Sequence, residues 1–290
     1  MRRKTRNDQP DAQTLAVLVA AGFPESHAAS FALLVYASCW IKCHHPAEFL
    51  AAMLNSQPLG FYSASQLVQD AKRHGVQVRP ADVMHSDYDC TLEGLPHPPA
   101  VRLGLRLIAG LKKESAERIV AARGERPFDS ADDLPRRAEL EQHEMRLLAG
   151  ADALMSLSGH RRQQVWEALA LKRPPELLRE APVNEDLLEL PPAPEGEEIV
   201  FDYSTTGLTL RRHPLALLRP QLAKRQLMTA EERYRLPNGR LVRYCGIVTL
   251  RQQPDTAGGT IFVSLEDETG VVQVIVWKSL RERKQPANTC

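Results

Sequence analysis

The sequence has little of what a disulfide-stabilised or membrane-spanning protein needs. Its 290 residues include only five cysteines, which form no disulfide framework and are typical of a reducing compartment. The longest apolar run, residues 31–37, is far shorter than the roughly 20 residues that cross a bilayer. The basic N-terminal hexapeptide, MRRKTR, is followed by a short apolar stretch without a convincing cleavage site. We therefore expect a cytoplasmic protein.

An excess of one charge is also absent overall, although the two signs are unevenly distributed. The formal net charge is +1, and 43% hydrophobic and 25% charged residues are ordinary for a globular chain. Residues 172–202 hold three basic and nine acidic residues, whereas residues 205–251 hold ten basic and two acidic ones. This order is typical of an acidic tether leading to a polyanion-binding domain. The alternative is that solvated charges happen to cluster.

The first half of the chain has the periodicity of helices. Helices are expected at residues 26–42, 47–55 and 63–74, with Ser63 as an N-cap and Gly75 as the glycine that ends the third helix. Residues 101–107 alternate apolar and basic side chains, which predicts a half-buried strand. A turn into an amphipathic helix is predicted at residues 108–123. Further helical patterning lies at residues 13–20, 130–138, 141–149 and 161–171.

The second half changes character twice. Residues 174–194 are rich in proline and acidic residues, which predicts a stiff, poorly structured linker. Residues 241–251, 260–267 and 270–277 alternate with a period of two, which predicts three strands. The expected fold class is therefore α+β and mainly α.

The segment Ile108–Arg123 has the outline of a helix-hairpin-helix motif, with Gly110 in the hairpin. Free backbone amides at the start of a helix can bind a phosphate oxygen without reading bases. The usual second glycine is replaced by Lys112, which weakens the match. The alternative is an ordinary surface helix. The basic side chains expected to contact DNA here are Arg106, Lys112, Lys113, Arg118 and Arg123.

Two other patterns suggest metal chemistry. Cys39 and Cys43 have the spacing of zinc ligands, but no second pair lies nearby, and we interpret them as small packed residues at a helix end. Asp87 and Asp89 have the spacing of a two-metal carboxylate pair, and we interpret them as part of a loop.

The stretch from Gly22 to Pro46, GFPESHAASFALLVYASCWIKCHHP, resembles a segment late in the fingers domain of bacterial C-family replicative DNA polymerases, above all their error-prone branch. NSQPLGFY at residues 55–62 and GLTLRRHP at residues 207–214 extend the resemblance, which covers roughly residues 22–277. It implies a series of parts. These are an atypical N-terminus (1–20), the end of the fingers (21–100), a helix-hairpin-helix module (101–171), a linker (172–198), a connecting segment (199–240) and a truncated OB-fold (241–290).

The resemblance also assigns DNA contacts to the β region. An OB-fold binds single strands through stacking aromatic rings and a basic groove, and the candidates here are Tyr244, Phe262 and Trp277, with Arg243 and Arg251. The alternative is that Phe262 and Trp277 fill the core. Since polymerases of this family use the fingers near the incoming nucleotide, Ser26, His27 and Lys42 are candidates for that neighbourhood.

As a family member, the intact parent would be a DNA-directed DNA polymerase that acts in damage tolerance and uses Mg²⁺. The palm, thumb and PHP regions have no counterpart here, so we expect no nucleotidyl transfer, no catalytic residue, no bound metal and no cofactor in this chain alone. Residues 174–198 contain no Gln and no Phe and hence no clamp-binding motif. This favours an accessory polymerase-like protein as the link to the sliding clamp. The alternative function is a protein-interaction scaffold, or a non-functional truncated product.

Overall fold

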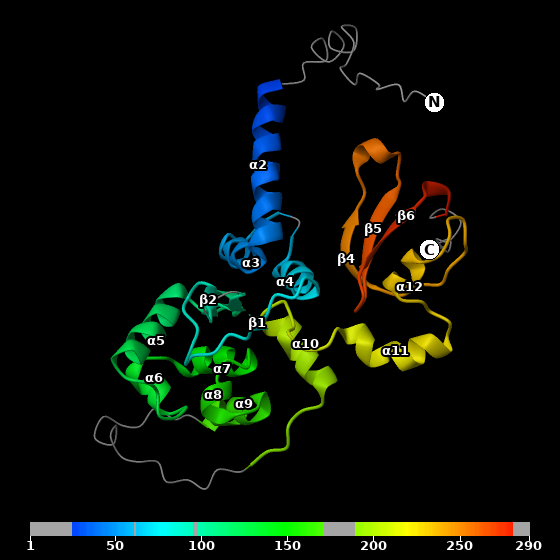
Figure 1. Cartoon of the computed structure of the whole chain (residues 1–290). Helices are drawn as coiled ribbons and strands as arrows, with labels where there is room; N and C mark the ends of the chain where they lie inside the picture. Colours follow the sequence, from blue (N-terminus) through cyan, green and yellow to red (C-terminus); the bar gives the residue numbers. More distant parts are fainter. Residues whose placement is uncertain (1–24, 61, 95–97, 171–188, 281–290) are drawn as a thin grey trace, which may run out of the picture.

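The computed structural model describes residues 25–60, 62–94, 98–170 and 189–280 of the chain, so the helical patterning at residues 13–20 lies outside it (Figure 1). The described chain is rich in helices and contains two separate three-stranded sheets. The prediction of a mainly helical α+β protein is confirmed at this level. Within the described ranges, no helix is both long and apolar enough to cross a bilayer.

The first described helix, α2 (Glu25–His44), stands away from the rest of the molecule (Figure 1). It begins after Pro24, ends before Pro46 and contains the whole of the predicted range 26–42. None of its residues 27–44 is buried, because apolar side chains occur all round it and no single face packs against the described chain. Leu33 and Tyr36 are each 70% exposed, and Leu34 is 61% exposed. Cys39 and Cys43 are exposed as well, so the interpretation of them as packed residues is wrong.

Two short helices follow at the base of α2, namely α3 (Pro46–Asn55) and α4 (Ala64–Arg73). The predicted N-cap of α4 is confirmed. The Ser63 hydroxyl accepts from the Gln66 amide while the Gln66 side chain accepts from the Ser63 amide, which is a full capping box. Gly75 follows with φ +83°, the left-handed conformation that a glycine after a helix supplies.

A small sheet follows, with strands β1 (Val78–Arg79), β2 (Thr91–Glu93) and β3 (Ala100–Arg102) in the order β1-β3-β2. β3 pairs parallel to β1 and antiparallel to β2. The prediction of a half-buried strand over residues 101–107 is wrong. All three residues of β3 are buried because it is the central strand, and residues 105–107 form the 3-10 helix η1 (Leu105–Leu107). Gly104 ends the strand where a Cβ would lie 2.4 Å from the Tyr88 carbonyl oxygen.

The predicted hairpin module consists of short helices on the left of Figure 1. One continuous buried cluster joins it to α3 and the small sheet and includes Leu54, Val101, Ile119 and Leu148. The boundary expected after residue 100 therefore falls inside β3 and inside this core. The helices are α5 (Lys113–Glu125), α6 (Asp133–Arg137), α7 (Gln142–Gly150), α8 (Met155–Ser158) and α9 (Arg161–Ala170).

Most of the predicted acidic linker lies outside the described residues, but its end is helical. α10 (Glu195–Thr205) is followed by α11 (Pro214–Lys224) and α12 (Ala230–Tyr234). α10 is fixed to the hairpin module by Arg161, whose side chain is 3% exposed and pairs with Glu198 (3.0 Å) and with Asp202.

The second sheet is an antiparallel meander of β4 (Ile247–Gln252), β5 (Ile261–Glu266) and β6 (Val271–Val276), on the right of Figure 1. The short 3-10 helix η3 (Asp255–Ala257) lies between β4 and β5. Strands are thus present in all three predicted places, although the first starts six residues later than expected. Whether this sheet belongs to an OB-fold remains a prediction.

Candidate nucleic-acid interface

The hairpin Ile108–Lys112 connects η1 to α5 and has the geometry of a phosphate-binding turn. Ile108 is anchored in the core at 2% exposure, and the Leu111 amide donates to the Ile108 carbonyl over 3.2 Å. Between them Gly110 has φ +84°, a conformation that costs an L-residue about 1–2 kcal/mol. A Cβ there would lie 3.4 Å from the Leu147 side chain, which is an ordinary van der Waals contact. The backbone conformation, and not a lack of space, therefore favours glycine at this position.

Two backbone amides of this hairpin are open, whereas those of Ile108, Ala109 and Leu111 donate to backbone carbonyls. α5 has no side-chain cap, and among the described residues the amides of Gly110 and Lys112 have no hydrogen-bond acceptor. Lys112 and Lys113 are both exposed at the same end of the helix. An uncapped helix start with free N–H groups and two cations favours an anion, because the helix dipole adds to both charges.

A second hairpin with a left-handed residue at the same place follows at residues 138–141 and leads into α7. Ala109-Gly110-Leu111-Lys112 and Ala138-Glu139-Leu140-Glu141 each place a left-handed residue second, and Glu139 has φ +50°. The sequence-based interpretation missed this repeat, for which the shared Ala-x-Leu spacing before two helices is the identifying signal.

The second hairpin is closed to anions. Glu141 and Glu144 form a capping box that occupies the first amides of α7. Burial alone would raise the pKa of Glu144, but hydrogen bonds from the Ser115 hydroxyl and the Glu141 amide outweigh it and leave that pKa lowered. The Glu141 carboxylate therefore stands where the first hairpin has Lys112, and Gln142 stands where it has Lys113. Of the two hairpins, only the first has the charge and the free donors for a phosphate.

Three of the arginines predicted to contact DNA, Arg106, Arg118 and Arg123, donate hydrogen bonds to backbone carbonyls within the protein. Arg118 donates to the Ala138 carbonyl (2.9 Å) and so holds the second hairpin against α5. Arg123 donates to the carbonyls of Val83 and Ser86 and pairs with Asp87 at 2.7 Å. These bonds give both side chains a packing role, and a DNA contact by either one stays a prediction.

Arg106 has a similar position on the other side of the hairpin. It donates to the Asn55 carbonyl (2.6 Å) and pairs with Asp89 (2.7 Å), so it joins η1 to the end of α3. Asp87 and Asp89 lie in a loop, as the sequence indicated, and each pairs with an arginine. The structure brings Gly110, Lys112 and Lys113 together at the hairpin, whereas the three arginines are bonded to carbonyls of other segments.

Among the predicted residues of the β region, Arg243, Arg251 and Phe262 do not form one surface. Arg251 shares a sheet face with its register partner Val263, whereas Phe262 is paired with Gln252 on the opposite face. Arg243 lies before β4, exposed, and its carbonyl accepts from Met228 at 2.9 Å. Phe262 is 38% exposed, so it does not simply fill the core.

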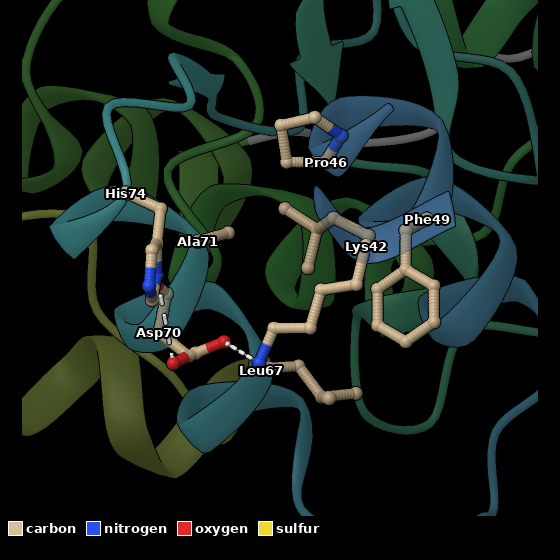
Figure 2. Close-up of a pocket in the computed structure, with 8 residues that line it drawn as sticks. Lys42, Pro46, Phe49, Leu67, Asp70, Ala71 and His74 are labelled. Carbon is tan, nitrogen blue, oxygen red and sulfur yellow. Dashed lines mark hydrogen bonds and ion pairs between the residues drawn. The ribbon is translucent and has the colours of Figure 1, made fainter. Parts of the chain in front are cut away.

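The predicted nucleotide-proximal residues also lie apart. Ser26 and His27 are in the first turn of α2, where the His27 ring contacts the Phe31 ring in a tilted arrangement with centroids 4.2 Å apart. Lys42 is at the other end of the same helix, about 24 Å away by helix rise. Figure 2 shows Lys42 reaching Asp70 of α4, with Nζ 2.7 Å from the carboxylate. The pocket there measures about 50 Å³, which is far too small for a nucleotide.

The comparisons with known proteins agree with this geometry. A family model described as a helix-hairpin-helix motif matches residues 75–164, the part that contains both hairpins. The chain is 56% identical over 267 residues to an error-prone DNA polymerase of Bordetella parapertussis, 54% over 271 residues to one of Ralstonia nicotianae and 51% over 265 residues to one of Alkalilimnicola ehrlichii. Each alignment covers 91% of this chain but only 25–26% of the relative.

The chain is therefore similar to DNA polymerases, and its residues 75–164 match a helix-hairpin-helix motif. More particularly, it is similar over nearly all its length to error-prone DNA polymerases, and the resemblance stated from the sequence is confirmed. It spans about a quarter of the length of the curated relatives it matches.

Proposed function

We propose that this chain is the part of an error-prone DNA polymerase that holds DNA by its phosphate backbone, through the first hairpin. The observation that carries the proposal is the open start of α5, where the amides of Gly110 and Lys112 lie beside two exposed lysines. Backbone amides and lysines contact phosphates and carry no sequence information. The chain should thus bind duplex DNA with little sequence preference.

Polymerase chemistry and damage tolerance are the proposed activities of the longer parent. Mg²⁺ is the ion that such a parent would use. Within the described residues, no group of three or more His, Cys, Asp or Glu side chains is placed to hold a metal ion, so the donors here do not fit that role and no catalytic step is assigned to them. An accessory polymerase-like protein that connects the parent to a sliding clamp remains a further proposal.

The test is charge reversal at the hairpin. The Lys112→Glu/Lys113→Glu variant should lose at least tenfold in affinity for each of two duplexes of unrelated sequence, measured by fluorescence anisotropy at low salt. Arg233→Glu/Arg235→Glu, at the end of α12 and just after it, makes the same charge change on the opposite side of the molecule (Figure 1) and is the matched control. Equal losses in both variants would mean that overall charge, and not the hairpin, governs binding.

A protein-contact function is the second candidate, and the exposed apolar surface of α2 favours it. Leu33, Leu34 and Tyr36 are each more than 60% exposed, and an exposed apolar patch of this kind marks contact sites. A Leu34→Glu/Tyr36→Glu variant should then lose a protein that the wild-type chain recovers from nuclease-treated lysate. Recovery of the same protein by the variant would show that α2 is not the contact surface.

A further inference from the structure

Two cations lie over the ring of Tyr88, and one of them belongs to the first hairpin. The Lys113 ammonium is 5.6 Å from the ring centroid, and the central carbon of the Arg106 guanidinium is 5.5 Å from it. Both distances are within the roughly 6 Å over which the negative face of an aromatic ring attracts a cation. Tyr88 lies in the loop between β1 and β2, so this contact joins that loop to the start of α5.

The Tyr88 ring is held by the backbone on which it stands. The Arg106 amide donates to the Tyr88 carbonyl over 3.0 Å. The Leu105 amide donates to the carbonyl of the preceding residue, Asp87, over 2.9 Å. The ring is half-buried and packs against the main hydrophobic cluster. Among the described residues its hydroxyl makes no hydrogen bond, so the ring itself provides the contacts of this side chain.

Lys113 is the first residue of α5, where a cation is electrostatically unfavourable, because the macrodipole places partial positive charge at the start of a helix. Within the described chain its carboxylate partner is Glu117, one turn later, at 3.6 Å. A lysine that precedes its glutamate by four residues is the weaker order for such a pair, and both side chains are 58% exposed. The ion pair alone therefore holds the Lys113 side chain only weakly.

The Tyr88 ring attracts the Lys113 ammonium without neutralising it. A carboxylate cancels the charge that a phosphate would meet, whereas an aromatic face leaves the full positive charge in place. Lysine has a long side chain that loses rotamer freedom when it binds, and a contact that restricts it beforehand reduces this loss. The ring provides such a contact at the helix end where the amides of Gly110 and Lys112 are open.

We propose that Tyr88 is a positioning residue that prepares Lys113 for a backbone phosphate of duplex DNA, and that Glu117 competes with the phosphate for the same ammonium. The inference rests on the proposed function, since it assigns the neighbours that set the charge of the first hairpin. The two neighbours act in opposite directions, because the ring leaves the charge of Lys113 available and the carboxylate has to release it.

The main experiment is a double-mutant cycle between Tyr88 and Lys113, with the duplex affinity of the full chain measured by fluorescence anisotropy at low salt. Tyr88→Leu should weaken binding about two- to fivefold in the wild-type chain and should have no effect in a Lys113→Ala background. Tyr88→Phe keeps the ring and should bind as the wild type does. Tyr234→Leu is the matched control, because its ring lies 4.9 Å from the Arg233 guanidinium carbon on the opposite side of the molecule (Figure 1).

Glu117→Gln tests the competing carboxylate. It should tighten duplex binding by about 1.4- to 2.3-fold, since the ion pair no longer has to be broken. Glu125→Gln removes the same charge from the last residue of α5, where the described chain shows no ion pair, and is the control for a general change of charge. Tightening by Glu117→Gln that does not exceed that of Glu125→Gln would overturn the assignment of Glu117.

Equal weakening by Tyr88→Leu in both backgrounds would show that the ring acts on the fold and not through Lys113, and it would overturn the proposal. A folded Tyr88→Leu variant that binds as tightly as the wild type would do so too. Circular dichroism melting identifies the temperature at which each variant is folded. Lys113→Ala separates this inference from the proposed function. If this variant binds duplex as the wild type does, both fail, whereas if it binds weakly and Tyr88→Leu has no effect, only this inference fails.

Discussion

Gly110 and Gly124 are both in or next to α5, but their backbones differ. Gly110 has φ +84° with its α-carbon facing Leu147, whereas Gly124 is helical with no atom within 4 Å of the place that a methyl group would take. Gly110→Ala should therefore destabilise the chain by about 1–2 kcal/mol, and Gly124→Ala should stabilise it by roughly 0.5–1 kcal/mol. Urea unfolding measures both, and two effects of the same sign would contradict the hairpin conformation.

Substitution of Arg123 tests whether this side chain stabilises the fold or contacts DNA. Its side chain is 16% exposed and donates to two carbonyls as well as to Asp87. Arg123→Ala should cost about 2–4 kcal/mol in unfolding free energy, since three acceptors lose their donor. Its DNA affinity at a temperature where the variant stays folded should equal that of the wild type. A stable variant with weakened DNA binding would show that the sequence-based prediction for this residue was right.

At the residue scale, the sequence indicated which side chains are basic but not which ones are free. Lys112 and Lys113 follow the hairpin at the helix start, so sequence position alone places them at the surface. Arg118 and Arg123 lie later in α5, and their carbonyl acceptors come from residues up to 40 positions away. Partners that distant leave no local pattern, and this is why the prediction treated all of them alike.

At the scale of elements, Glu93 ties the three strands of the first sheet together. It pairs with Arg102 of β3 at 2.7 Å and with Arg79 of β1 at 2.6 Å. The Arg102 hydrogen bond, supported by Arg79 and opposed by burial, holds the pKa of Glu93 below its usual value. A carboxyl with a lowered folded-state pKa stabilises the fold above the unfolded-state value of 4.5, and this stabilisation is lost as the pH falls through the folded-state value.

The Glu93→Gln variant should accordingly melt at a lower temperature than the wild type at pH 7. The difference should shrink as the pH falls below about 4.5 because both chains then lack the carboxylate charge. Differential scanning calorimetry across pH 3–7 measures it. A difference that is constant with pH would show that the shape of the side chain matters here and its charge does not.

Helix α2 gives a second prediction at this scale. Leu34→Ala should change the unfolding free energy by less than about 0.5 kcal/mol, whereas Leu54→Ala in α3 should cost about 2–5 kcal/mol. The first leucine is 61% exposed and the second is fully buried. A large loss for Leu34→Ala, especially one that depends on protein concentration, would mean that α2 is covered by another copy in solution.

The elements differ in how well the sequence predicts them. The bounds of α2, α3 and α4 follow from Pro24, Pro46, Ser63 and Gly75, which act locally. Burial does not follow from local signals, since the apolar residues of α2 have no covering element among the described residues. α11 was not predicted because it carries Pro220 inside the helix, where proline usually ends one.

At the scale of the whole molecule, the acidic segment (residues 172–202) and the basic segment (residues 205–251) partly neutralise each other through ion pairs. Glu195 and Glu198 from the acidic segment pair with Arg212 and Arg211 from the basic one. Arg211 and Arg212 are therefore poor candidates for contacts with a polyanion. In the basic segment, residues 205–251, the better candidates are exposed cations whose side chains pair with no carboxylate of the described chain. These are Lys224, Arg225, Arg240, Arg243 and Arg251. Such pairing depends on the fold and is invisible to a count of charges along the chain.

The most direct measurement of the central claim is the salt dependence of duplex binding for the wild-type chain and for Lys112→Ala/Lys113→Ala. Each lost phosphate contact lowers the slope of log affinity against log salt concentration by about 0.9. If the first hairpin holds the backbone, removing both lysines should reduce that slope by about 2 while the two unrelated duplex sequences remain equally bound. An unchanged slope in a folded variant would contradict the account.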